Sequence, residues 1–274
     1  GLDEYLRAHA ITGISEIDTR ALTRHLRSEG AMRGAIAPAG TDADGLRSRI
    51  LAQPKMEGLD LACGVSTDEP YVVPAVGEER FHVLAYDFGV KAHSPKLLAE
   101  RGCRVTVIPA NTTAEEILAT KPDGLFVSNG PGDPAAVQAA EKAILALAEA
   151  NVPVFGICLG HQLICRAFGA RTYKLPFGHH GGNHPVRNLD REAVEITSQN
   201  HGFAVESGEG DQIPGAPGLR LTHVNLYDGT AEGVKHRDFP VISVQYHPEA
   251  APGPHDSRYL FDEFLLLMEE RQGS

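Results

Sequence analysis

The cysteine at position 158 lies in a setting suited to nucleophilic chemistry. It is the centre of a Gly-Ile-Cys-Leu-Gly segment at 156–160, after an apolar stretch and before a helix-like one. A Gly-x-Cys-x-Gly turn between a strand and a helix projects the sulfur from the carboxyl end of the strand. The first N–H groups of the helix then favour a thiolate and a developing oxyanion. The alternative, a buried structural cysteine, fits Cys165 better, because Cys165 falls in the apolar stripe of the following helix.

A cysteine nucleophile needs a histidine to carry its proton, and often a third group to orient that histidine. Among 13 histidines the best candidate is His247, in a Tyr-His-Pro-Glu segment at the end of an expected strand. Extended residues two apart point the same way, so Glu249 can hold the ring of His247. Taken alone, this segment could equally be a surface turn. Together with the cysteine turn, it predicts a Cys158–His247–Glu249 triad.

Two polar segments could surround a substrate near this triad. Residues 128–134, Ser-Asn-Gly-Pro-Gly-Asp-Pro, leave backbone N–H groups accessible for an oxyanion hole, although an ordinary turn has the same composition. Residues 198–203, Ser-Gln-Asn-His-Gly-Phe, suit a substrate wall, with a hairpin turn as the alternative.

Three histidines, His179, His180 and His184, resemble a metal cluster at first sight. We expect them in a glycine-rich loop without a cysteine or carboxylate ligand at matching spacing, so no metal is predicted.

The pattern after residue 80 predicts an α/β domain with an open, largely parallel sheet flanked by helices. Expected strands at 81–86, 104–108, 125–128 and 152–157 alternate with expected helices at 91–100, 113–119, 135–150 and 159–168. From residue 178 onward the pattern loosens into loops with strand-like pieces at 193–197, 221–226 and 241–246, before a helix at 256–270.

The chain is predicted to have three parts. Residues 1–63 form the tail of a smaller N-terminal domain, residues 64–80 a linker, and residues 81–274 the α/β domain. The first part should hold a helix capped by Asp18 or Thr19. Because residue 1 is glycine, we expect the numbering to start inside a longer protein.

Composition excludes several classes of protein. The net charge of -11 opposes nucleic-acid binding. No run approaches the roughly 18 apolar residues of a membrane span, and no signal peptide opens the chain, so we expect no membrane association and a cytoplasmic location. The four cysteines, at 63, 103, 158 and 165, lack CxxC spacing and are expected to be reduced.

Several motifs resemble known families. The segments at 156–162 and 246–249 resemble the class I, or triad-type, glutamine amidotransferases, a resemblance that covers residues 81–270. The segments at 17–23 (Ile-Asp-Thr-Arg-Ala-Leu-Thr), 177–183 (Phe-Gly-His-His-Gly-Gly-Asn), 198–203 and 249–254 (Glu-Ala-Ala-Pro-Gly-Pro) are similar to the small subunits of carbamoyl-phosphate synthetases. Together these motifs span nearly the whole chain.

The resemblance implies a glutaminase. Cys158 would form a γ-glutamyl thioester, His247 would shuttle protons and Glu249 would orient His247. The ammonia would pass to a large subunit, which uses ATP, Mg²⁺ and bicarbonate to make carbamoyl phosphate for arginine and pyrimidine synthesis; no cofactor is expected in this chain. By position, the glutamine-binding residues would be Gly130, Gly132, Leu159, Gln162, Asn200, Gly202 and Phe203, with Gly132 and Leu159 supplying the oxyanion N–H groups.

This sequence departs from the family pattern in two places. Family members carry a further N-terminal segment with a glutamine-contacting serine, and they often have Lys-Arg-Asn where this chain has Lys91-Ala92-His93. Two alternatives stay open: an amidotransferase subunit of another synthase, for anthranilate or GMP, and a truncated docking subunit without turnover.

Overall fold

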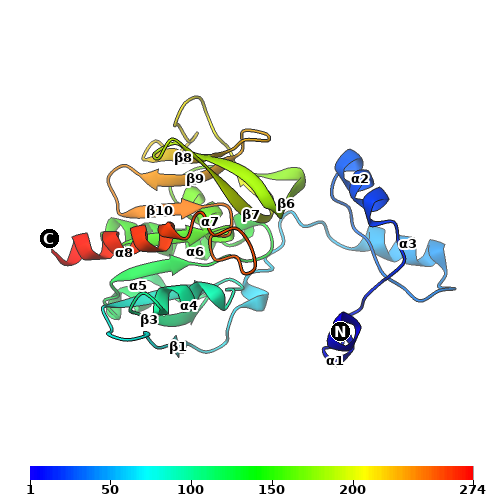
Figure 1. The fold of residues 1–274 in the computed structure, drawn as a ribbon, viewed down its shortest axis with the longest axis horizontal. Helices are drawn as coiled ribbons and strands as arrows, with labels where there is room; N and C mark the ends of the chain where they lie inside the picture. Colours follow the sequence, from blue (N-terminus) through cyan, green and yellow to red (C-terminus); the bar gives the residue numbers. More distant parts are fainter. Residues whose placement is uncertain (274) are drawn as a thin grey trace. The chain divides into compact units, whose positions relative to one another are not determined.

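The computed structural model describes residues 1–273, which fall into two compact units, Gly1–Met56 and the chain from Glu57 onward (Figure 1). The first unit contains α1 (Leu2–Ala8), α2 (Thr19–Glu29) and α3 (Ala43–Ala52). The expected cap of α2 is confirmed, since the Asp18 side chain accepts a hydrogen bond from the Ala21 N–H. The sequence analysis places the end of the first part at residue 63, whereas the compact units divide between Met56 and Glu57.

The second unit is built on one ten-stranded sheet, in the order β1-β3-β2-β4-β5-β10-β9-β8-β6-β7. The strands are β1 (Tyr71–Val73), β2 (Phe81–Asp87), β3 (Cys103–Pro109), β4 (Gly124–Val127), β5 (Val154–Ile157), β6 (Thr172–Asn188), β7 (Ala193–Val205), β8 (Leu219–Asn225), β9 (Ala231–His236) and β10 (Val241–Val244). The residues expected as a linker contain β1, which pairs antiparallel with β3 because Tyr-Val-Val is a short run of strand-forming residues.

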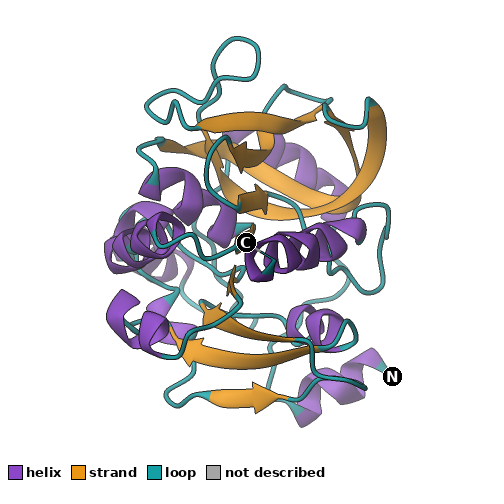
Figure 2. Ribbon diagram, turned by 90° about the vertical axis from the view of Figure 1, so that its left-hand side faces the viewer, coloured by secondary structure: helices purple, strands orange, loops and turns teal. Residues whose placement is uncertain are grey.

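One end of the sheet has the expected parallel α/β arrangement. Strands β3, β2, β4, β5 and β10 run parallel, and helices cover both faces (Figure 2). Apolar side chains on both faces of β2 explain why helices cover both faces, since alternate residues of a strand point to opposite sides. Val83 and Ala85 pack in the core cluster that contains residues of α4 and α8. Leu84 and Tyr86 pack in the cluster that contains residues of α5, α6 and α7. The helices are α4 (His93–Ala99), α5 (Ala114–Ala119), α6 (Gln138–Glu149), α7 (Leu159–Ala167) and α8 (Tyr259–Gln272), with short 3-10 turns at Cys63–Val65 and Pro134–Ala136.

The other end of the sheet corrects the sequence interpretation. Strands β9, β8, β6 and β7 extend it in antiparallel pairs, and the residues expected to form a glycine-rich loop lie within β6. The physical reason is that Gly178 and Gly181, both with positive φ, fall where the β6–β7 register shifts. Glycine therefore permits bulges inside a continuing strand here, rather than ending the strand.

No helix among residues 1–273 is long and apolar enough to cross a membrane.

Candidate active site

Cys158 lies in a strained turn between β5 and α7. Its backbone has φ 56° and ψ -105°, a region that side-chain-bearing residues rarely adopt. The Cys158 N–H donates to the carbonyl of Val244 at 2.9 Å, and the Cys158 carbonyl accepts from the Gln162 N–H at 3.2 Å. The thiol is thereby fixed at the N-terminus of α7, where the helix dipole favours negative charge. The strand–turn–helix context predicted for Cys158 is confirmed.

The two flanking glycines are required by close backbone contacts. A Cβ at Gly160 would lie 2.1 Å from the carbonyl oxygen of Val127. One at Gly156 would lie 2.4 Å from Ile164 Cδ1 and 2.8 Å from the Gly160 carbonyl. Any side chain at either position would force β4, β5 and α7 apart and displace the sulfur.

His247 and Glu249 lie near the same sheet edge because β10 is the parallel neighbour of β5. The register pairs Val244 with Ile157, so the residues after both strands emerge together. His247 Nδ1 lies 2.7 Å from Glu249 Oε1, and both side chains are buried. The ring is therefore oriented by the carboxylate, as the spacing of the two residues predicts.

The electrostatics of His247 link it to Cys158. Burial lowers the pKa of His247, but the charge of Cys158, the contact with its sulfur and the bond to Glu249 outweigh burial and raise the pKa to about 10. His247 Nε2 makes no hydrogen bond with a nitrogen or oxygen of the described residues. This nitrogen is left to exchange a proton with the sulfur.

Lys91 also reaches the pair, which the sequence did not predict. Its Nζ lies 3.1 Å from Glu249 Oε1 and 3.0 Å from His247 Nδ1, so two cationic groups share one carboxylate oxygen. The charges of His247 and Lys91 lower the pKa of Glu249 against the opposing effect of burial, which is the largest single influence. Its position in the sequence could have indicated this role, because Lys91 follows the carboxyl end of β2, where site residues of parallel sheets gather.

The segment expected as a substrate wall is part of strand β7 and lies beside the sulfur. Cys158 Sγ is 3.8 Å from the carbonyl oxygen of Asn200. The side chain of Asn200 contacts His180, with Oδ1 3.2 Å from His180 Nδ1. Gln162, on α7, donates through Nε2 to the Phe203 carbonyl at 2.8 Å. Of the residues named for glutamine binding, Asn200, Phe203 and Gln162 are thus linked around Cys158.

The loop after β4 approaches the same helix from the other side. A Cβ at Gly130 would lie 2.1 Å from the Phe88 carbonyl and 2.8 Å from Leu159 Cδ2, so the loop packs closely on the start of α7. Gly132 has φ 95°, a conformation that favours glycine. The remaining glycine of the set, Gly202, lies on β7 between Asn200 and Phe203.

The other cysteines differ from Cys158 in chemistry. Burial raises the pKa of Cys165 well above its usual range and that of Cys103 to about 12. Burial, together with Asp60, raises the pKa of Cys63 to about 11. These three are thiols at neutral pH and poor nucleophiles.

Three histidines, His179, His180 and His184, resembled a metal cluster in the sequence. Of these, only His179 belongs to the group of possible metal-binding side chains found among residues 1–273, and its companions are His201 and Glu232. These three residues come from β6, β7 and β9, so sequence spacing could not reveal the group.

Comparison with known proteins agrees with this geometry. The family model described as "Glutamine amidotransferase class-I" matches residues 84–267, and the model "Carbamoyl-phosphate synthase small chain, CPSase domain" matches residues 1–36. The crystal structure of a putative GMP synthase subunit from Thermoplasma acidophilum superposes with a TM-score of 0.60 at 20% identity, covering 72% of this chain and 98% of its own, and supports the fold alone.

Curated relatives align over nearly all of this chain. The carbamoyl phosphate synthase small chain of Chlorobaculum tepidum is 54% identical over 98% of this chain and 72% of its own length. Those of Salmonella typhimurium and Escherichia coli K12 are 49% and 48% identical, over 100% and 98% of this chain and 74% and 73% of their own. The chain therefore belongs to the carbamoyl phosphate synthase small chain family and carries a class-I glutamine amidotransferase domain.

Proposed function

We propose that this chain is the glutaminase subunit of a carbamoyl phosphate synthase, hydrolysing glutamine to glutamate and ammonia. The observation that carries the proposal is the convergence of the strained Cys158 turn with the His247–Glu249 pair at the ends of adjacent parallel strands. Membership of the small chain family supports the choice of synthase over the anthranilate and GMP alternatives.

In the first half of the reaction, the Cys158 thiolate attacks the side-chain amide carbon of glutamine. The carbonyl oxygen becomes an oxyanion, which the backbone N–H groups of Gly132 and Leu159 would stabilise. As this intermediate collapses, the carbon–nitrogen bond breaks and the His247 imidazolium gives its proton to the leaving nitrogen. Ammonia leaves, and a γ-glutamyl thioester on Cys158 remains.

In the second half, His247 takes a proton from water, and the resulting hydroxide attacks the thioester. The carbon–sulfur bond breaks, which releases glutamate and restores the thiolate beside the imidazolium. Glu249 keeps the ring of His247 aligned through both proton transfers. Glutamine would be held by Gly130, Gly132, Leu159, Gln162, Asn200, Gly202 and Phe203.

The ammonia would pass to a large partner subunit that consumes ATP, with Mg²⁺, and bicarbonate. Two further points stay predictions from the sequence: that the carbamoyl phosphate serves arginine and pyrimidine synthesis, and that the protein is cytoplasmic.

The test uses this chain assembled with its large subunit. Cys158→Ser should reduce glutamine-dependent carbamoyl phosphate synthesis by at least about 10³-fold, because the hydroxyl cannot replace the thiolate. Ammonia-dependent synthesis by the same preparation should persist, which shows that the synthetase step is intact. Full activity of Cys158→Ser with glutamine would contradict the assignment.

A labelling experiment separates turnover from a docking role. A glutamine-like chloroketone should add once to the wild-type chain, at Cys158, as read by intact mass and peptide mapping. The label should be absent from Cys158→Ser and unchanged in Cys165→Ser, the matched control. A wild-type chain that stays unlabelled would favour the docking alternative.

A further inference from the structure

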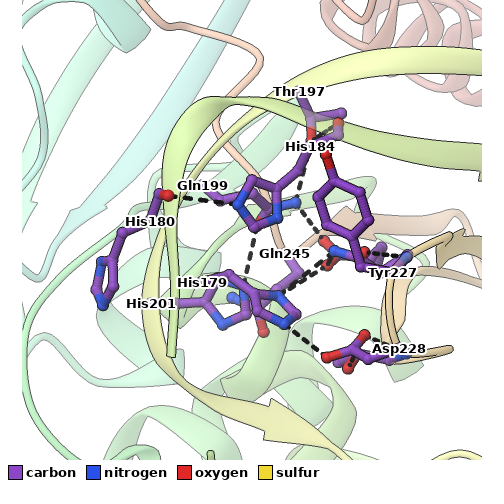
Figure 3. Close-up of polar contacts among 12 residues, drawn as sticks. His179, His180, His184, Thr197, Gln199, His201, Tyr227, Asp228 and Gln245 are labelled. Atoms are coloured by element: carbon purple, nitrogen blue, oxygen red, sulfur yellow. Dashed lines mark hydrogen bonds and ion pairs between the residues drawn. The ribbon is translucent and has the colours of Figure 1, made fainter. Parts of the chain in front are cut away.

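Residues of β6, β7 and β9 form a cluster of buried polar side chains, and Figure 3 shows His179, Gln199 and His201 among its members. Its centre is Glu232, which is wholly buried on β9. Oε1 of Glu232 accepts from Asn225 Nδ2 at 2.8 Å, and Oε2 accepts from Gln199 Nε2 at 2.9 Å. A carboxylate at such depth is unfavourable unless it is hydrogen-bonded and neutralised.

The neutralising group is His179. Its Nδ1 lies 3.4 Å from Glu232 Oε1, and its Nε2 lies 2.8 Å from Asp228 Oδ2. Burial lowers the pKa of His179, but the interactions with Glu232 and Asp228 outweigh burial and raise it. The rings of His201 and His184 lie 4.9 Å and 5.3 Å from the His179 ring, and burial lowers the pKa of both. The interactions with Glu232 and Asp228 therefore favour the charged form of His179 over that of its two neighbours.

From Glu232 the contacts continue toward β7. Gln199 Nε2 donates to Glu232 Oε2 and to Thr197 Oγ1, so its Oε1 faces His201 Nε2 at 2.9 Å. The other nitrogen of His201, Nδ1, lies 2.7 Å from the Phe203 carbonyl. A neutral imidazole donates to one acceptor at a time. The position of Gln199, and hence of Glu232, therefore affects the bond that His201 makes to Phe203.

The Phe203 carbonyl joins this cluster to the glutamine site. It also accepts from Gln162 Nε2 at 2.8 Å, and the same nitrogen donates to Gln245 Oε1 at 2.9 Å. The backbone N–H of Gln245 in turn donates to the carbonyl of Glu232 at 2.8 Å. Gln162 and Phe203, both assigned to glutamine binding, are thus fixed by a closed set of contacts that starts at the His179–Glu232 ion pair.

We propose that His179 and Glu232 are positioning residues for glutamine, which fix the Phe203 carbonyl and the Gln162 amide through Gln199 and His201. This inference rests on the proposed glutaminase function. Loss of the ion pair should weaken glutamine binding more than chemistry, because neither residue bonds to Cys158, His247 or Glu249 side chains in the described structure.

A metal ion is the competing occupant of the cluster, since the ligand atoms of His179, His201 and Glu232 lie within 4.8 Å of one another. Both oxygens of Glu232 already accept hydrogen bonds, at 2.8 and 2.9 Å. Both nitrogens of His201 face oxygen atoms, at 2.7 and 2.9 Å, and the neutral ring donates to one of them. The hydrogen bonds of Glu232 hold the cluster without a metal ion, and metal content is an outcome of the test.

The experiment measures KM and kcat for glutamine in the assembled complex, for wild type, His179→Asn and Glu232→Gln. We expect each variant to raise KM roughly tenfold with less than about a threefold change in kcat. The matched control is His236→Asn on the same strand as Glu232, where the ring receives the N–H groups of Asp238 and Phe239 and lies outside the cluster. That variant should leave KM unchanged even if it lowers Tm.

The pH dependence of KM gives a readout that does not depend on a variant folding. His179 has a raised pKa, so its charge is present at low pH and lost as pH rises through that pKa. The wild-type KM should therefore rise with pH, and in a folded His179→Asn that step should be absent. The groups facing His179 are Asp228, Glu232, His184 and His201, and burial lowers the pKa of the last two.

The outcomes are distinguishable. No glutamine hydrolysis by the wild-type complex would overturn the proposed function and this inference with it. Hydrolysis with an unchanged KM in folded variants, or a wild-type KM without a pH step, would overturn the inference alone. One equivalent of zinc in the wild-type complex, lost in His179→Asn, would replace the hydrogen-bonded cluster with a metal site.

Discussion

Two buried imidazole–carboxylate pairs lie in different halves of the sheet. His247 and Glu249 follow β10 at the parallel end, 2.7 Å apart, whereas His179 and Glu232 lie on β6 and β9 at the antiparallel end, 3.4 Å apart. The carboxylate helps to raise the pKa of the histidine in both pairs. The pairs therefore resemble each other in charge and burial.

The third neighbour of each ring makes the difference. His247 faces the thiol of Cys158, which can give and take a proton, whereas His179 faces Asp228, a second carboxylate. A ring between a carboxylate and a thiol can carry protons during a reaction, whereas two carboxylates beside a ring both favour its charged form. The third contact thus distinguishes the pair proposed to be catalytic from the pair proposed to position glutamine.

The largest expected difference between the pairs comes from removing each carboxylate charge. Glu249→Gln should lower kcat by at least about 10²-fold, because the amide can stabilise the wrong tautomer of His247 and does not stabilise its imidazolium. Glu232→Gln should act mainly on KM. This contrast is checked by steady-state kinetics of the two variants side by side, with ammonia-dependent synthesis as the control for the synthetase step. An equal loss of kcat in both variants would contradict the contrast.

The pH dependence of kcat sharpens the comparison. The pKa of His247 is raised to about 10, so the imidazolium is present below that pH and lost as the pH rises through it. We expect kcat to fall above about pH 10 in the wild type. In Glu249→Gln the alkaline fall should move to lower pH, because the bond to Glu249 contributes to the raised pKa. The measurement is a pH–rate profile for both proteins, taken where ammonia-dependent synthesis is retained. If kcat falls at the same pH in both, the role of Glu249 is contradicted.

The smallest effect is expected at Asp228, the partly exposed second carboxylate beside His179. The side chain of Asp228 is 42% exposed, and solvent screens its interaction with His179. Asp228→Asn should raise KM for glutamine about two- to threefold and leave kcat unchanged. The measurement is the same kinetic assay. A larger increase in KM in Asp228→Asn than in Glu232→Gln would contradict the prediction that Glu232 matters more than Asp228.

The parallel end of the fold could be predicted because its signals are local. Each strand expected between residues 81 and 157 is present, and the turn at Cys158 follows from five consecutive residues. His247 and Glu249 were likewise singled out from adjacent residues at a strand end. Their position near the end of β5 depends on β10 lying parallel beside it, which the sequence did not predict.

The antiparallel end could not be predicted in the same way. Gly178 and Gly181 indicated a loop, although they form bulges within β6, and β9 was not anticipated. His179, His201 and Glu232 meet only because of the register of three strands, which those bulges shift. Lys91 was visible as a residue after β2, but its reach to Glu249 depends on side-chain geometry.

The place of β10 has a consequence for the timing of activity. It lies between β5 and β9 in the sheet although it is the last strand of the described residues, and it precedes His247 by only a few residues. A nascent chain that has already formed the Cys158 turn therefore lacks His247, the proposed proton carrier, beside the sulfur until β10 inserts between its neighbours. Contacts between residues so distant in sequence form slowly. An incomplete chain would therefore expose the Cys158 thiol but would not hydrolyse glutamine.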